Sequence, residues 1–149
     1  MSTPINSANI STGDRPIALL NHPDPRVRFI YCGNAGSTND IYVFQVDKPT
    51  KGNLLLFGSP LSISNGVFAA MKFRPDGKFL YVLTNDLNNP PVSGPILTSF
   101  DVDTKTGGLN LPQGGIGSNQ PVRQLTLRSP QRGLIATAVA VDRTGEFAY

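Results

Sequence analysis

The sequence predicts an all-β fold built from repeated four-stranded antiparallel units, and three observations lead to this prediction. Hydrophobic residues make up 39% of the 149 residues and charged residues only 15%, while Gly and Pro are frequent at 15 and 13. Such a mixture is typical of short strands joined by turns. A tight-turn signal, PDG at 75–77, separates two apolar strands, and similar strand sequences occur before and after it.

The first unit is expected over about residues 16–58. Residues 1–15 are rich in Ser, Thr, Asn and Gly without an apolar period, which predicts a flexible N-terminal leader. Four short apolar runs follow, separated by turn-forming residues. We expect them to be the four strands of the unit, at 16–20, 28–34, 41–47 and 54–57.

The second unit is expected over about residues 67–127, and a third unit begins at about 134–149. Pro75 presets the first turn position and Gly77 accepts a positive φ, so the strands on either side form a hairpin. The proline-rich loop near residue 90 leaves the sheet, because proline donates no ladder hydrogen bond. The expected strands of this unit are 67–73, 78–84, 96–103 and 122–127.

Self-comparison of the chain makes the repetition explicit. FIY at 29–31 returns as FLY at 79–81 and as FAY at 147–149, spaced by 50 residues (29 to 79) and 68 residues (79 to 147). FQVD at 44–47 returns as FDVD at 100–103. Repeats of about 40–50 residues with four strands each are the sequence signature of β-propeller blades. The sequence therefore predicts about two and a half blades, an incomplete propeller.

Three motifs support a family resemblance: PDGKFLYV at 75–82, SFDVDTKTG at 99–107 and DRTGEFAY at 142–149. With them the chain resembles the lactonase-type seven-bladed β-propeller family, which includes 6-phosphogluconolactonase-like proteins and is related to the YVTN surface-protein repeats. The resemblance covers roughly 16–149 and corresponds to the N-terminal part of such a propeller. It implies sugar-lactone hydrolysis as an activity of the complete ring, and it assigns no catalytic residue to a position of this sequence.

The number of blades bears on function. Closed propellers have roughly 4–8 blades, and each blade buries its apolar faces only against its neighbours. We therefore expect a binding or assembly module whose partners are further blades of the same chain or copies of itself. The alternative is a lactone hydrolase, once the propeller is complete. A YVTN-like cell-surface repeat would require export, for which the N-terminus shows no signal.

Candidate ligand-binding residues follow from propeller geometry, because small ligands bind at the mouth of the central channel. Arg15, Asn65 and Arg132 each precede a predicted innermost strand. Two arginines near one mouth could hold a small anionic or sugar-like ligand through forked hydrogen bonds. The alternative is that they are ordinary loop charges in solvent. Arg74 and Asp142 would lie at the far end of these strands.

Several classes of function are not indicated. The net charge of +3 is scattered, so no nucleic-acid partner is expected. Cys32 is the only cysteine and His22 the only histidine, so no disulfide, metal site or cofactor is predicted. No run approaches the roughly 18 apolar residues of a membrane span. With no signal peptide at the start, the expected location is cytoplasmic.

Overall fold

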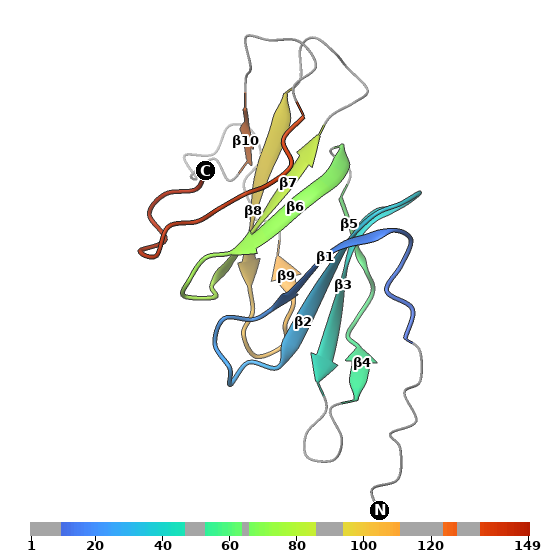
Figure 1. Ribbon diagram of the computed structural model, residues 1–149. Coiled ribbons are helices and arrows are strands. Elements are labelled where there is room, and N and C mark those ends of the chain that lie inside the picture. Colours follow the sequence, from blue (N-terminus) through green and yellow to red (C-terminus); the bar gives the residue numbers. More distant parts are fainter. Residues whose placement is uncertain (1–9, 47–52, 64–65, 86–93, 111–123, 128–134) are drawn as a thin grey trace, which may run out of the picture.

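The computed structural model describes residues 10–46, 53–63, 66–85, 94–110, 124–127 and 135–149, and these residues form two antiparallel sheets without a helix. Figure 1 shows the first sheet in blue and teal and the second in green to orange. The first has the order β1-β2-β3-β4, with β5 also paired to β3. Its strands are β1 (Pro16–Asn21), β2 (Phe29–Ala35), β3 (Asn39–Val46), β4 (Leu54–Leu56) and β5 (Leu61–Ser62).

The second sheet repeats this arrangement. Its order is β6-β7-β8-β10, and β9 pairs with β8. Its strands are β6 (Val67–Phe73), β7 (Phe79–Asn85), β8 (Pro95–Val102), β9 (Leu109–Asn110) and β10 (Gln124–Thr126). The predicted all-β fold with four-stranded antiparallel units is thereby confirmed. The short strands β5 and β9 were not predicted.

The two sheets share an irregularity in their first strand pair. The register shifts between Pro16 and Ala18 in the first sheet and between Phe68 and Ala70 in the second. A bulge at the same place in both sheets means that β1 and β6 are equivalent strands. Beyond the bulge, Leu20 pairs with Tyr31 as Lys72 pairs with Tyr81.

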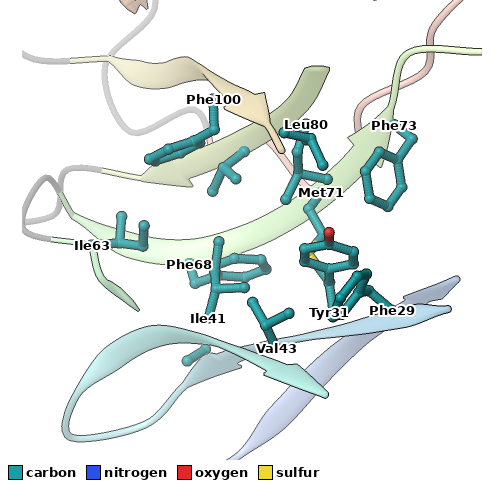
Figure 2. Close-up of a cluster of buried hydrophobic side chains, with 13 residues drawn as sticks. Phe29, Tyr31, Ile41, Val43, Ile63, Phe68, Met71, Phe73, Leu80 and Phe100 are labelled. Atoms are coloured by element: carbon teal, nitrogen blue, oxygen red, sulfur yellow. The ribbon is translucent and has the colours of Figure 1, made fainter. Parts of the chain in front are cut away.

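The core lies between the two sheets (Figure 2). Here β6 packs across β1, β2 and β3. The ring of Phe73 meets that of Tyr31 edge-on at 5.1 Å between centroids. Gly33 makes room for the Phe68 ring, because a Cβ at this glycine would lie 2.2 Å from it. The buried members are Phe29, Tyr31, Ala35, Ile41, Val43, Ile63, Phe68, Met71, Phe73, Leu80, Val82, Phe100 and Val102.

Residues 135–149 form a third hairpin beside the second sheet, drawn in red in Figure 1. Val141 and Ala148 make an isolated bridge, and the backbones of Ala140 and Tyr149 exchange hydrogen bonds of 2.9 and 2.8 Å. The sequence predicts the start of a third unit here, and the structure shows a hairpin held by few backbone hydrogen bonds.

Candidate docking surfaces

Arg15 is the one predicted ligand-binding residue that lies within the described residues. It has a φ of 53° and bends the chain into β1, and its carbonyl accepts a 3.0 Å hydrogen bond from the Ala35 N–H. Its side chain is exposed. Asn65 and Arg132 lie outside the described residues, and the predicted ligand site stays a prediction.

His22 has a structural role in the turn between β1 and β2. Its Nδ1 accepts a 3.1 Å hydrogen bond from the Asp24 N–H, so the proton is on Nε2, which donates to the carbonyl of Gly77 at 3.0 Å. A hollow of about 410 Å³ lies beside it, lined by this turn and by Phe29, Ile30 and Val46. Because both ring nitrogens of His22 are engaged, the imidazole is not free to act on a ligand in that hollow.

The turn that follows the first strand is closed by the same backbone hydrogen bond in all three hairpins. In each, the first turn residue donates its N–H to the carbonyl of the phenylalanine that begins the next strand. This equivalence aligns HPD at 22–24 with RPD at 74–76, an offset of 52 residues (22 to 74). The FIY and FLY repeats are only 50 residues apart (29 to 79), because the first turn is two residues longer than the second. The three bonds are His22 to Phe29 at 3.2 Å, Arg74 to Phe79 at 2.9 Å and Asp142 to Phe147 at 3.0 Å.

Each of the first two turns rests against the turn of the following hairpin. His22 lies over Gly77, where a Cβ would be 2.3 Å from the imidazole, and Arg74 lies over Gly145, where a Cβ would be 2.7 Å from the guanidinium Nε. Both glycines have positive φ, 71° and 75°. Glycine is therefore needed twice over at these positions, for conformation and for contact.

Asparagine side chains link each sheet to the first strand of the next hairpin. Asn39 Oδ1 accepts a 3.2 Å hydrogen bond from the Phe68 N–H, at the start of β6. The amide of Asn85 both accepts from the Ala136 N–H at 3.0 Å and donates to the Ala136 carbonyl at 2.9 Å. Phe68 and Ala136 occupy equivalent positions, six residues before Arg74 and Asp142. No sequence motif pointed to these asparagines, whose role depends on the arrangement of the sheets.

A tyrosine and a phenylalanine of the first sheet form the centre of the contact with the second. Phe29 is 4% and Tyr31 0% exposed. The Tyr31 hydroxyl donates to the carbonyl of Gly107 at 3.0 Å, and a Cβ at Gly107 would lie 2.4 Å from the ring of Phe29. Burial raises the pKa of Tyr31 well above its ordinary value, so the phenol keeps its proton for this bond.

The equivalent pair in the third hairpin is exposed. By the turn alignment, Phe147 and Tyr149 correspond to Phe29 and Tyr31, yet their exposed fractions are 60% and 77%. Ala140, which exchanges backbone bonds with Tyr149, is exposed on the same side. We call Ala140, Phe147 and Tyr149 the trailing face.

A second apolar surface lies on β1. Tyr31 points into the core, and its partner Leu20 packs there too, so Leu19 points to the opposite side of the sheet. Leu19 is 65% and Ile17 47% exposed. In β6 the position equivalent to Leu19 is Met71, which is 5% exposed because it packs between the sheets. We call Ile17 and Leu19 the leading face.

Residues 10–15 cover the part of this side of the sheet that lies over β2 and β3. The Thr12 side chain lies beside the Cys32 thiol. Gly13 lies so close to Asn34 that a Cβ would be 2.4 Å from its Nδ2. Asp14 Oδ2 accepts a 3.0 Å bond from the Ser37 N–H. The equivalent side of the second sheet contacts the first sheet. On the first sheet, residues 10–15 cover the part of that side over β2 and β3.

A polar cluster lies beneath that segment. Asn34 is fully buried and donates a 2.8 Å hydrogen bond to Asp40 Oδ1, while Thr38 donates a 2.9 Å bond to the other oxygen of Asp40. The Cys32 thiol contacts Asn34 Oδ1 at 3.7 Å. Burial raises the pKa of Cys32, so the thiol stays protonated and is a poor nucleophile. The cluster has the character of a satisfied structural network.

Neither a metal centre nor a membrane segment emerges from the described part of the chain. It contains no group of three His, Cys, Asp or Glu side chains placed to hold a metal ion. It also contains no helix long and apolar enough to cross a membrane. Comparisons of the chain with protein-family models, with curated proteins and with solved structures each gave no match.

Proposed function

We propose that the chain is a binding and assembly module, a part of a β-propeller that docks further blades of a longer chain or copies of itself. The observation that supports it is the contrast between equivalent positions. Phe29 and Tyr31 are buried by the second sheet, whereas Phe147 and Tyr149 on the third hairpin are exposed. Exposed aromatic and aliphatic clusters of this kind mark interaction sites on soluble proteins.

The repeated contacts between units give the proposal its geometry. Two features recur in both contacts: a turn glycine under the preceding turn and an asparagine bonded to the new first strand. In the first contact a buried aromatic pair, Phe29 and Tyr31, also lies between the sheets. The third hairpin presents the equivalent pair, Phe147 and Tyr149, as exposed side chains. A further strand resembling β6 is the partner that this surface fits.

Sedimentation velocity of the purified chain tests the proposal. We expect a mass above the 16.0 kDa of one chain, with association rising with concentration. Replacing Phe147 and Tyr149 together by serine is expected to return the mass to that of one chain. A wild-type chain that stays a soluble monomer at all concentrations would sink the assembly proposal, because its exposed apolar faces should associate.

The enzymatic alternative, lactone hydrolysis by a complete propeller, rests on the family resemblance alone. His22, the only histidine, makes structural hydrogen bonds with both ring nitrogens. No described observation favours the small anionic ligand at Arg15 over the assembly function. Release of acid from a δ-lactone by a longer form of the chain, measured with a pH indicator, is the result that would favour the alternative.

A further inference from the structure

We propose that the partner of the trailing face is the leading face of a second copy of this chain, docked head to tail. The inference rests on the proposed assembly function and deepens it by naming both the occupant and its orientation. Its starting point is the contact that already exists within the chain. There the first strand of one unit, β6, lies across β1 and β2 of the unit before it.

The trailing face and the leading face are equivalent to the two surfaces that meet in that contact. The trailing face has the residues equivalent to Phe29 and Tyr31, and the leading face has Leu19 in the position of Met71. Met71 and Tyr31 belong to one buried cluster (Figure 2). Placing β1 of a second copy over the third hairpin would therefore bring Leu19 against Tyr149 in the way Met71 meets Tyr31.

The existing contact also indicates which turns would meet, although the β1–β2 turn has no glycine and is two residues longer than the β6–β7 turn. Within the chain, His22 contacts the following turn at Gly77, and Arg74 contacts the one after it at Gly145. Asp142 occupies the equivalent position in the third turn, so it would face the β1–β2 turn of the second copy. That turn contains Arg26, whose side chain is 89% exposed and pairs with Asp24 at 2.9 Å, and the half-buried Arg28. With Asp24 paired to Arg26, Arg28 leaves this turn a net positive charge, which favours a position opposite Asp142.

Residues 10–15 do not cover the leading face. They lie over β2 and β3 through Cys32, Asn34 and Ser37, whereas Ile17 and Leu19 on β1 stay exposed beside them. In the existing contact, β6 is the strand of the second sheet that packs on β1, β2 and β3. Since β1 is equivalent to β6, β1 is the strand that would make the new contact. A contact of this kind is heterologous, so the docked pair keeps one free leading face and one free trailing face and can continue the series or close a ring.

The test mixes two variants, each with one face disabled. Leu19→Ser removes the leading face, and Phe147→Ser with Tyr149→Ser removes the trailing face. Each variant alone is expected to sediment at the 16.0 kDa of one chain. Mixed in equal amounts, they are expected to form a complex of twice that mass, because the intact trailing face of the first variant meets the intact leading face of the second. Circular dichroism checks that both variants fold.

The control is Leu55→Ser, at a residue 52% exposed on β4 and pointing to the opposite side of the first sheet from Leu19. It is expected to associate as the wild type does, while either disabled face weakens association by about tenfold or more. If the wild type associates but the mixture stays at one chain mass, the head-to-tail inference is overturned and the assembly function stands. If the wild type does not associate, both are overturned.

Discussion

The hydroxyl of Tyr31, in the first sheet, donates a 3.0 Å hydrogen bond to the carbonyl oxygen of Gly107, which lies 76 residues later in the turn before β9. Both residues are buried, so neither group has water as a substitute partner. The bond therefore couples the two sheets by polar as well as apolar contact. The aromatic ring alone would pack against Phe73 without fixing where the β8–β9 turn rests.

Tyr31→Phe is expected to lower the free energy of unfolding by about 1–2 kcal/mol, because the Gly107 carbonyl is left buried without its donor. Guanidinium unfolding followed by circular dichroism measures the change. Tyr149→Phe is the matched control, since Tyr149 is 77% exposed and its hydroxyl faces water. Equal losses in both variants would contradict the role assigned to the bond.

Gly77→Ala and Gly58→Ala separate conformational strain from lost space. Both glycines have positive φ, 71° and 68°, so each substitution is expected to cost about 1 kcal/mol from conformation alone. A Cβ at Gly77 would lie 2.3 Å from the His22 ring, whereas a Cβ at Gly58 has no atom within 4 Å. Gly77→Ala is therefore expected to cost about 1–3 kcal/mol more, by overpacking.

Thermal unfolding of the two variants beside the wild type provides the measurement. Loss of the His22 to Gly77 hydrogen bond can be followed separately by the chemical shift of the imidazole protons in the Gly77 variant. Two variants with the same midpoint would show that the turns of successive units do not press on one another in solution.

The strands could be predicted from the sequence because their signals are local. The Pro75-Asp76-Gly77 turn and the alternation around Phe79 and Tyr81 specify a hairpin without knowledge of distant residues. The repeat of FIY, FLY and FAY placed equivalent aromatics in three units, but it could not show that two copies are buried or half-buried and the third exposed. That difference depends on which neighbour covers each unit.

The contacts between units could not be predicted. Asn39 and Asn85 look like loop residues in sequence, and they lie on different strands, β3 and β7, although both bind the first strand of the next hairpin. Likewise, residues 1–15 were expected to be a flexible leader, whereas residues 10–15 contact β2 through bonds such as that from the Ala35 N–H to Arg15. Side-chain to backbone bonds across tens of residues leave no periodic pattern in sequence.

Asn85→Ala is expected to loosen the third hairpin more than the second sheet. The substitution removes hydrogen bonds of 2.9 and 3.0 Å to Ala136 and is expected to cost about 1–2 kcal/mol. Amide hydrogen exchange at Ala136 should accelerate while exchange at Val82, in the middle of the second sheet, stays slow. Asn39→Ala, which removes a single bond to the Phe68 N–H, is the comparison and should show the smaller effect on its own partner. Unchanged exchange at Ala136 would contradict the link.

Acid is expected to destabilise the third turn through Asp142. Hydrogen bonds from the Thr144 hydroxyl and from the Phe147 N–H lower the pKa of this carboxyl from 3.8 to about 2. A carboxyl with a lowered folded-state pKa stabilises the fold above its unfolded value and loses that contribution as the pH falls from 3.8 towards about 2. Asp142→Asn cannot titrate, so its stability should fall less steeply over this interval than that of the wild type.

Melting temperatures measured at closely spaced pH values give the two slopes. Asp24 is the internal comparison, because its pKa is also lowered to about 2, first by the hydrogen bond from the Arg26 side chain. Asp24→Asn is expected to remove a similar part of the acid dependence from a different turn. If Asp142→Asn and the wild type lose stability in parallel as the pH falls, the carboxyl does not contribute as stated.

Gly13→Ala is expected to lift residues 10–15 from the first sheet and expose Cys32. The substitution places a Cβ 2.4 Å from Asn34 Nδ2, at a φ of 94° that disfavours side chains. In the wild type the thiol is 2% exposed and burial raises its pKa, and both effects slow its reaction with a disulfide reagent. Labelling of the variant should be faster by on the order of tenfold, through more frequent local opening. Gly58→Ala, with a similar φ but free space around it, should label at the wild-type rate. Equal rates in all three proteins would mean that the segment does not guard the thiol.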